Sequence, residues 1–496
     1  MLAEAVDPSE AEGMAPPLRA WLEATLLAMR GVAAPTPGSD VAAVQPPAGF
    51  FTTLHYLHNA LIHVRAEKLQ ESIARLCEVW WASGVEGCEA LVAQLTPYRA
   101  LVLLSRGRSA TAADVQRLWA LRDALLIFDT EDASFDSLRK LLLRCATLPV
   151  IHRAAIGRRL LAFLFARISA AFMLEMHQVI MAQVVEATKR SKMPAHFGEV
   201  YWRAWNLCSD AIAGTSESAE TTEAEAREAQ LMKRTFEQRC VQDAMSRCVR
   251  TGSTALHGIV RNLLAAAFHA HKKDAGADAL LCRLWEPILW RSLRAPHPTL
   301  RLHATHILCD AFPIQDPDGL DSEENAALLE RQFVALNERM RDDDPKVRTS
   351  AARGACRVLA SFWKLTSAQH RRKLLCTLVD DLANDVASTA VRVAVMEGIA
   401  VIVEECTPAR SVLKSLLPRL RKSIHDRSPR VRAALLSILL AVKSVRGIHF
   451  SKVVPLNQIL ARLATDGATT KVTSGKGQSK SVVILASELL ANSYFP

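Results

Sequence analysis

The sequence has 496 residues, of which 50% are hydrophobic and only 20 are glycine, and its formal net charge is +10. This composition disfavours a turn-rich β fold and favours helices with short connections. No uninterrupted apolar run reaches the ~20 residues of a membrane span, and the eleven scattered cysteines contain no C-x-x-C pair. A membrane helix, a disulfide framework and a zinc ribbon are therefore disfavoured.

In chain order, residues 1–50 are expected to be partly disordered, with a short amphipathic helix at 18–29 and then a Pro/Gly-rich linker. Acidic residues near the start argue against a signal peptide. Residues 51–213 show one helical pattern after another and form a predicted N-terminal helical region. Residues 214–232 are polar and acidic, which indicates a solvated insertion or linker. Residues 233–496 form a predicted repeat array with a flexible loop at 467–480.

The repeat array is predicted from one pattern that occurs four times between about residues 284 and 465. An amphipathic helix leads through a short turn into a second helix that opens with an aliphatic-Arg pair. Successive pairs are separated by about the ~40–47 residues of a HEAT or armadillo repeat. The pairs are Leu300-Arg301, Val347-Arg348, Val391-Arg392 and Val431-Arg432.

The first helix of the fourth repeat illustrates why the repeats must stack. Its predicted apolar stripe cannot remain exposed to water and needs a neighbouring helix pair to cover it. The stripe consists of Val412, Leu413, Leu416, Leu417, Leu420 and Ile424. The tryptophans cluster as Trp80-Trp81, Trp202/Trp205 and Trp285/Trp290. Their helical spacing makes most of them expected core residues, and the alternative is that some line a groove for a partner peptide. The sequence therefore predicts an all-α fold, a HEAT-repeat α-solenoid of the armadillo-like type.

The array is expected to be truncated at its C-terminus. A fifth repeat starts at Pro455, and the last predicted helix covers residues 481–492, shortly before the chain stops. No polar capping repeat follows this helix, although solenoids usually need one.

Two turns of the array contain signals for the start of a helix. Asp344-Pro345 and Ser428-Pro429 each place an N-cap residue before a proline at the first helical position. We expect the side-chain oxygen of the cap to accept a hydrogen bond from a free helix amide. Proline at this position loses nothing by lacking its own amide hydrogen.

The repeat arginines are expected to have a structural role. Each follows an aspartate, and such positions should form a ladder of Asp–Arg contacts between neighbouring repeats, because an arginine along a repeat seam needs a carboxylate partner. The alternative is that these arginines contact nucleic acid. The residues concerned are Arg348, Arg392 and Arg432, after Asp344, Asp385 and Asp426.

The positive charge is concentrated near the C-terminus. Residues 401–496 contain fifteen Lys or Arg and five Asp or Glu, which equals the whole net charge of +10. Cations spread over adjacent repeats can follow a phosphate backbone, so these side chains are candidates for binding double-stranded DNA. A solvated face that aids solubility is the alternative. The candidate residues are Arg421, Lys422, Arg427, Arg430, Lys443, Arg446 and Lys452, joined by Lys471, Lys476 and Lys480 in the predicted loop.

The sequence suggests no catalytic or metal site. His303, His306 and Cys309 share one predicted helix, but a partly buried helix face explains them better than a metal site. The segment at 474–481 lacks the spacing of a phosphate-binding loop. No nucleophile elbow or metalloprotease motif occurs. We therefore expect no enzyme activity, no cofactor and no small-molecule substrate.

Several segments of the chain are distinctive in sequence. EPILWRSL and AFPIQDP, within residues 285–317, are the most specific, and LCEVWW, ADVQRLW, GRRLLAFLF and YWRAW precede them. DDDPKVR, LLPRLRKSIHD and NQILARLATD follow downstream. In this order they resemble a known family, the G-type HEAT-repeat subunit of the condensin II complex. The similarity covers about residues 50–496, whereas family members are roughly twice as long as this chain.

The resemblance implies a non-catalytic scaffold in the nucleus, on chromosomes. In that family the subunit binds the kleisin, which bridges a pair of SMC ATPases, together with a second HEAT subunit and chromosomal DNA, and the complex acts in mitotic chromosome condensation. The matching motifs are packing motifs and nominate no DNA-contacting residue. Two alternatives are a generic HEAT-repeat adaptor, such as a transport receptor or phosphatase scaffold, and a HEAT-like DNA glycosylase. The basic C-terminal third argues against the adaptor, and the N-terminal matches argue against the glycosylase.

Overall fold

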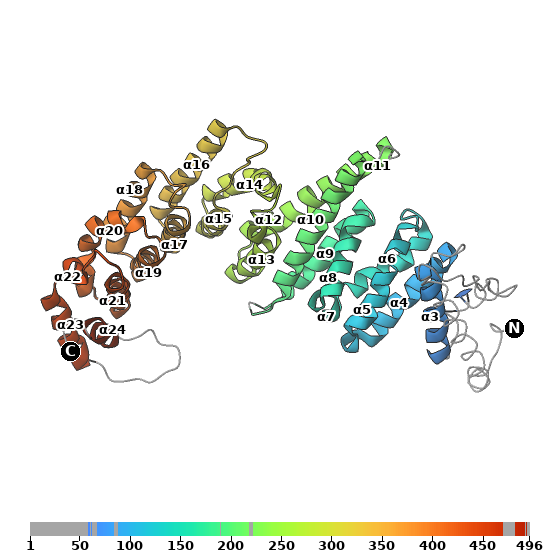
Figure 1. The fold of residues 1–496 in the computed structure, drawn as a ribbon, viewed down its shortest axis with the longest axis horizontal. Coiled ribbons are helices and arrows are strands. Elements are labelled where there is room, and N and C mark those ends of the chain that lie inside the picture. Colours follow the sequence, from blue (N-terminus) through green and yellow to red (C-terminus); the bar gives the residue numbers. More distant parts are fainter. Residues whose placement is uncertain are drawn as a thin grey trace, which may run out of the picture. The chain divides into compact units, whose positions relative to one another are not determined.

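The computed structural model describes residues 58–59, 61, 67–83, 88–188, 190–217, 222–469, 482–491 and 493. The helix predicted at 18–29 and the lysines of the predicted loop lie outside these residues. The chain divides into two compact units, which we describe separately (Figure 1). Unit 1 comprises Met1–Ala244 and Asn262–Ala270, and unit 2 comprises Met245–Arg261 and His271–Pro496. Among the described residues, no helix is long and apolar enough to cross a membrane.

Unit 1 is built from helices that pack in sequence order. α4 packs on α6, α5 on α8, and α8 on α10, so successive helix pairs lie next to one another (Figure 1). The α-helices are α3 (Glu67–Ser83), α4 (Val92–Arg106), α5 (Ala112–Ala120), α6 (Ala133–Cys145), α7 (Pro149–Arg153), α8 (Ala155–Arg167), α9 (Ala170–Glu186), α10 (Met193–Glu217) and α11 (Glu223–Thr235). Shorter 3-10 and π-helical turns are η1 (Cys88–Leu91), η2 (Gly107–Ser109), η3 (Asp123–Leu126) and η4 (Phe236–Val241).

Unit 2 contains the predicted repeats. The second helices α15, α17, α19 and α21 pack side by side in that order, and α24 packs on α21 (Figure 1). The helices are α14 (Ala277–Leu293), α15 (Pro298–Ala311), α16 (Ser322–Met340), α17 (Pro345–Ser361), α18 (Ala368–Cys376), η6 (Thr377–Asp381), η7 (Leu382–Asn384), α19 (Thr389–Glu405), α20 (Ala409–Leu416), η8 (Leu417–His425), α21 (Pro429–Lys443), α22 (Phe450–Val453), α23 (Leu456–Thr469) and α24 (Val482–Leu490).

The residues at the boundary of the two units also form helices. These are α12 (Gln242–Arg250), α13 (Thr254–Ala267) and the short η5 (His269–His271). The expected all-α HEAT-repeat fold is thus confirmed over the described residues. Of the clustered tryptophans, Trp80, Trp205 and Trp285 are buried as expected, whereas Trp81, Trp202 and Trp290 are only partly buried.

The first helix of the fourth repeat differs from its prediction. Instead of one amphipathic helix, α20 gives way at Leu417 to the 3-10 helix η8, whose second residue is Pro418. Proline cannot donate the amide hydrogen bond that an α-helix requires in its interior, so the helix changes type there. The stripe from Leu413 to Ile424 is buried, but Val412 is 37% exposed and lies outside it.

The acidic segment at 214–232 is largely helical where it is described. α10 continues to Glu217, and α11 starts at Glu223 with its own capping box, in which Thr222 and Glu225 exchange hydrogen bonds. Most of its side chains are exposed, because the segment has no apolar stripe to bury. Good helix formers and a strong cap therefore make a helix where we expected an insertion or linker.

One of the two predicted N-caps is confirmed. An Asp344 carboxylate oxygen accepts hydrogen bonds from the amides of Lys346, at 2.7 Å, and Val347, at 3.3 Å. The Ser428 hydroxyl makes no such bond, so the second prediction is wrong. Instead, the Ser428 amide donates a hydrogen bond to the Asp426 carboxylate at 2.8 Å. The side chain that stabilises this turn is therefore that of the aspartate and not that of the serine.

The predicted Asp–Arg ladder connects the repeats of unit 2. Each repeat arginine reaches forward to an aspartate one repeat later and also donates to carbonyl groups of the turn before its own helix. Its guanidinium thereby joins its own helix, the turn before that helix and the aspartate of the next repeat. Donor–acceptor distances in these arginine–carboxylate hydrogen bonds include 2.7, 2.8 and 3.1 Å. The pairs are Arg301–Asp342, Arg348–Asp385, Arg392–Asp426 and Arg432–Asp466.

The first aspartate of the ladder was predicted incorrectly. Asp342, not Asp344, accepts the Arg301 guanidinium, at 2.7 and 2.8 Å. Asp344 cannot serve both purposes because its carboxylate caps α17. In the sequence DDDP the ladder acid and the cap acid are therefore different residues, two positions apart.

Unit 1 contains an arginine with the same set of contacts, at a position that the aliphatic-Arg pattern does not predict. Arg158 donates to the Glu199 carboxylate at 2.6 Å and to the carbonyl groups of His152 and Arg153 at 3.2 and 2.7 Å. These are the contacts of a ladder arginine. Glycine precedes this arginine in place of an aliphatic residue, and the acid is glutamate, so the marker used for unit 2 misses it.

Candidate nucleic-acid interface

Four of the seven candidate cations lie together at one corner of unit 2. Arg421 and Lys422 belong to the end of η8, Arg427 lies in the turn, and Arg430 is the second residue of α21. All four side chains are exposed. We call this group the η8–α21 corner.

The other three candidates lie at the opposite end of α21. At about 1.5 Å of rise per residue, the helix separates its two ends by roughly 20 Å. Lys443 ends the helix, and Arg446 and Lys452 follow it. The Lys443 ammonium donates to the carbonyl groups of Leu489, at 3.1 Å, and Ala491, at 2.7 Å, and so caps the end of α24. The Lys443 ammonium therefore already has hydrogen-bond partners within unit 2.

The corner differs from the ladder in what its cations contact. Arg432 pairs with Asp466 and is largely buried, whereas no ion pair is found for Arg421, Lys422, Arg427 or Arg430 among the described residues. The carboxylate nearest to them in sequence, Asp426, is bound to Arg392. The guanidinium and ammonium groups of the corner therefore keep their charge available for an external anion.

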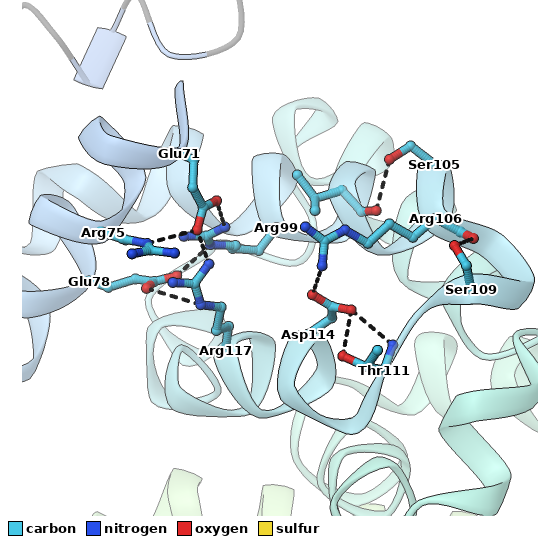
Figure 2. A network of polar contacts seen from close by, with 11 residues as sticks. Glu71, Arg75, Glu78, Arg99, Ser105, Arg106, Ser109, Thr111, Asp114 and Arg117 are labelled. Carbon is cyan, nitrogen blue, oxygen red and sulfur yellow. Dashed lines mark hydrogen bonds and ion pairs between the residues drawn. The ribbon is translucent and has the colours of Figure 1, made fainter. Parts of the chain in front are cut away.

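Unit 1 contains a buried network of charged groups that we did not predict. Arg99, which is 3% exposed, bonds to Glu78 and to Glu71, the latter at 2.7 Å, and Arg117 also bonds to Glu71 (Figure 2). Arg75 adds a further bond to Glu71 at 3.0 Å. The network joins α3, α4 and α5.

The two carboxyl groups of this network have opposite pKa shifts. Burial opposes ionisation of Glu71, but hydrogen bonds from Arg117 and Arg99 outweigh it and lower its pKa to about 2. Burial dominates at Glu78 and raises its pKa above the ordinary value, despite the nearby charge of Arg99. Divergent carboxyl pKa values are one mark of an acid–base site. Here both groups are bound by arginines between packed helices, which indicates a structural role.

The histidines singled out on α15 belong to a stacked triplet in unit 2. The rings of His257 and His303 are parallel with centroids 3.9 Å apart, and His257 Nε2 lies 3.0 Å from His306 Nδ1. His257 Nδ1 donates to the Cys248 carbonyl at 2.8 Å, so its Nε2 must accept the proton of His306. In the part of the chain that is described, no group of three or more His, Cys, Asp or Glu is arranged to hold a metal ion.

The triplet predicts acid sensitivity. Burial lowers the pKa of His257 to about 3, despite its hydrogen bond to Cys248, and lowers that of His306 to about 4. Burial also holds the pKa of His303 below its ordinary value. The unfolded chain takes up protons near pH 6.5, whereas the native rings do not, so stability is lost as pH falls below about 6.5.

We expect a loss of about 2 kcal/mol per buried histidine between roughly pH 7 and pH 5. Urea unfolding of the wild type and of His303→Phe at several pH values between 7 and 5 measures how the free energy of unfolding depends on pH. The phenylalanine variant should show the weaker pH dependence. Equal slopes for both proteins would contradict this prediction.

The buried thiols provide no nucleophile. Cys309 and Cys356 lie inside the α15–α17–α19 packing, and burial raises the pKa of both thiols to about 12. A thiol with so high a pKa is almost wholly protonated near neutral pH, and the thiolate is the reactive form. Their role is in packing.

The stacked helix pairs and the Asp–Arg ladder that connects them define a HEAT-repeat protein. Comparison with known proteins then specifies the group. The family model described as "Condensin II non structural maintenance of chromosomes subunit" matches residues 144–316. Condensin-2 complex subunit G2 of Xenopus laevis is 32% identical over 427 residues, and that of Homo sapiens is 32% identical over 402 residues.

The chain belongs to the condensin-2 complex subunit G2 family. The two matches cover 86% and 80% of this chain, but only 33% and 32% of the relatives, so the chain spans about a third of their length. A solved structure with Kap95p and RanGDP is similar over 98% of this chain and 65% of that chain, at 12% identity and a TM-score of 0.41. The fold assignment rests on the helix pairs themselves.

Proposed function

We propose that the chain is a non-catalytic scaffold of a condensin II complex that binds the kleisin and chromosomal DNA. Family membership supports the first part, because the relatives are named as subunits of condensin-2. By the same reasoning, the SMC ATPases and a second HEAT subunit are the further proposed partners, and the nucleus and chromosome are the proposed location. Kleisin binding is tested by co-purification of the chain with that subunit.

The observation that carries the DNA proposal is the η8–α21 corner. Its four cations are exposed and lie within ten residues of one another, and no ion pair with them is found in the described part of unit 2. Phosphate contacts of this kind release counterions and bind duplex DNA without reading its sequence. Arg446 and Lys452 remain candidates for a separate contact, and Lys443 is omitted because its ammonium caps α24.

Changing Arg421, Lys422, Arg427 and Arg430 together to Glu should weaken binding to duplex DNA by at least about tenfold at moderate salt. Losing four phosphate contacts should also reduce the slope of log K against log salt by about 3 to 4. Fluorescence anisotropy with a labelled duplex at several salt concentrations measures both quantities. The expected loss is independent of DNA sequence, because the contacts are to the backbone.

A matched variant controls for net charge. Lys364, Arg372, Lys373 and Lys414 are exposed cations elsewhere in unit 2, and changing them to Glu alters the charge by the same amount. This control should retain most of the affinity and the salt slope. Equal losses in both variants would show that only overall charge matters, and an unaffected corner variant that is properly folded would remove the DNA proposal for this corner.

A further inference from the structure

Unit 1 has a cationic surface of its own, where the end of α7 meets the start of α10. Arg153 ends α7, and Arg190 and Lys192 precede α10, and all three side chains are exposed. His196, in the first turn of α10, lies beside His152 of α7, with ring centroids 5.8 Å apart. Burial lowers the pKa of His196, and the charges of Arg158, Lys192 and Arg153 lower it further. We call this surface the α7–α10 corner.

The corner has an excess of positive charge. The carboxylate that acts on His196 is Glu199, and it is already held by Arg158, at 2.6 Å, and Arg203, at 2.8 Å. No ion pair is found for Arg153, Arg190 or Lys192 among the described residues of unit 1. An external carboxylate would therefore meet cations with no competing acid bound to them.

The start of α8 adds amide donors to this surface. The N-cap of this 13-residue helix is Ala154, which has no side chain able to accept a hydrogen bond. At two of the corresponding turns of unit 2, Asp344 and Ser388 accept hydrogen bonds from first-turn amides of α17 and α19, whereas Ser428 makes no such bond to α21. The first-turn amides of α8 thus lack a side-chain acceptor, and a helix N-terminus favours an anion.

A buried histidine beside these groups has an unused ring nitrogen. His152 is 8% exposed, its ring centroid lies 5.8 Å from that of His196, and its Nδ1 has no hydrogen-bond partner. Burial, with the charges of His196 and Arg153, lowers the pKa of His152 to about 4, so the ring is neutral. The pair is polar but uncharged, and the cations around it determine which ligand is attracted.

Apolar side chains distinguish this corner from the η8–α21 corner. Val150, Ile156 and Met193 are partly exposed and lie within three residues of Arg153 or Lys192 in sequence, whereas the neighbours of Arg427 and Arg430 in the turn are Ser428 and Pro429. A phosphodiester backbone offers nothing to apolar side chains, but a peptide can bury its own apolar side chains against them. We propose that the α7–α10 corner binds a peptide segment of a partner protein in which carboxylates alternate with apolar side chains.

This inference is independent of DNA binding by unit 2, and a random-peptide display library panned on the full chain tests it. We expect the recovered peptides to be rich in Asp or Glu and in apolar residues. For a synthetic copy of such a peptide, changing Arg153 and Lys192 to Glu should raise the Kd at least about tenfold. Ile156→Ser should raise it about threefold through the lost apolar contact.

The control variant carries Arg108→Glu and Lys140→Glu, two exposed unit 1 cations outside the corner, and should change the Kd less than about twofold. Peptides that bind the corner variant and the wild type equally would overturn the proposal. So would duplex DNA that displaces the peptide and is itself lost from the corner variant, because the corner would then be a nucleic-acid surface. Melting temperatures of all variants establish that they are folded.

Discussion

Replacing Asp342 with alanine should destabilise unit 2 by about 3 kcal/mol, because it leaves the partly buried Arg301 guanidinium without its buried carboxylate partner. The carboxylate is 3% exposed and accepts from Arg301 at 2.7 and 2.8 Å, from Arg339 at 2.9 Å and from the Asp344 amide at 3.0 Å. Burial alone would raise the pKa of Asp342, but the hydrogen bonds from Arg301 and the Asp344 amide outweigh it and lower the pKa. Urea unfolding monitored by circular dichroism measures the loss.

Asp343 provides the control at the adjacent position. Its side chain is exposed, so Asp343→Ala should change the free energy of unfolding by less than about 0.5 kcal/mol. A second variant, Asp342→Asn, keeps the shape and some hydrogen bonds but removes the charge, and should lie between the two. If Asp342→Ala were no more destabilised than Asp343→Ala, the ladder would not hold the repeats together.

Gly354→Ala should also be strongly destabilising, by about 2–3 kcal/mol, because the added methyl group has no space. A Cβ at this position would lie 2.0 Å from Cys309 Sγ and 3.0 Å from Cys309 Cβ. α15 and α17 can pack this closely only because glycine has no side chain. Gly398 has the same relation to Cys356, with a Cβ that would lie 2.4 Å from its sulfur.

Two further variants test this explanation. In Gly258→Ala the new methyl group meets nothing within 4 Å. Because alanine is favoured over glycine inside a helix, the free energy of unfolding should rise by about 0.5–1 kcal/mol. Combining Gly354→Ala with Cys309→Ala removes the sulfur in the way and should recover much of the lost stability, giving a favourable coupling energy. Additive effects of the two substitutions would mean that the sulfur contact is not the cause.

The aliphatic-Arg pairs predicted the repeats of unit 2 well because they mark a contact that every repeat must make. Arg348, Arg392 and Arg432 occupy equivalent positions, and each requires an acid one repeat later, so sequence spacing and packing coincide. The choice between Asp342 and Asp344 could not be made from spacing. The choice depends on which carboxylate lies near Arg301 of α15 and which lies near the first amides of α17.

The candidate site was predictable in part. Local charge density nominated Arg421, Lys422, Arg427 and Arg430 as candidates because they are close in sequence, and all four side chains are exposed. Lys443 was also predicted as a candidate, because the carbonyl groups that its ammonium binds lie more than forty residues away and cannot be seen in the local sequence. The histidine triplet and Arg99 with its two glutamates were missed for the same reason. Their partners come from separate helices, and no local pattern connects them.

If the η8–α21 corner binds DNA, a bound duplex must shield the backbone of that corner from solvent. Hydrogen–deuterium exchange of the full chain with and without a saturating DNA duplex measures this shielding. We predict slower exchange in the peptides covering residues 417–432, with little change over α17 and α18. Protection confined to other helices, with residues 417–432 unaffected at saturation, would contradict DNA binding at this corner.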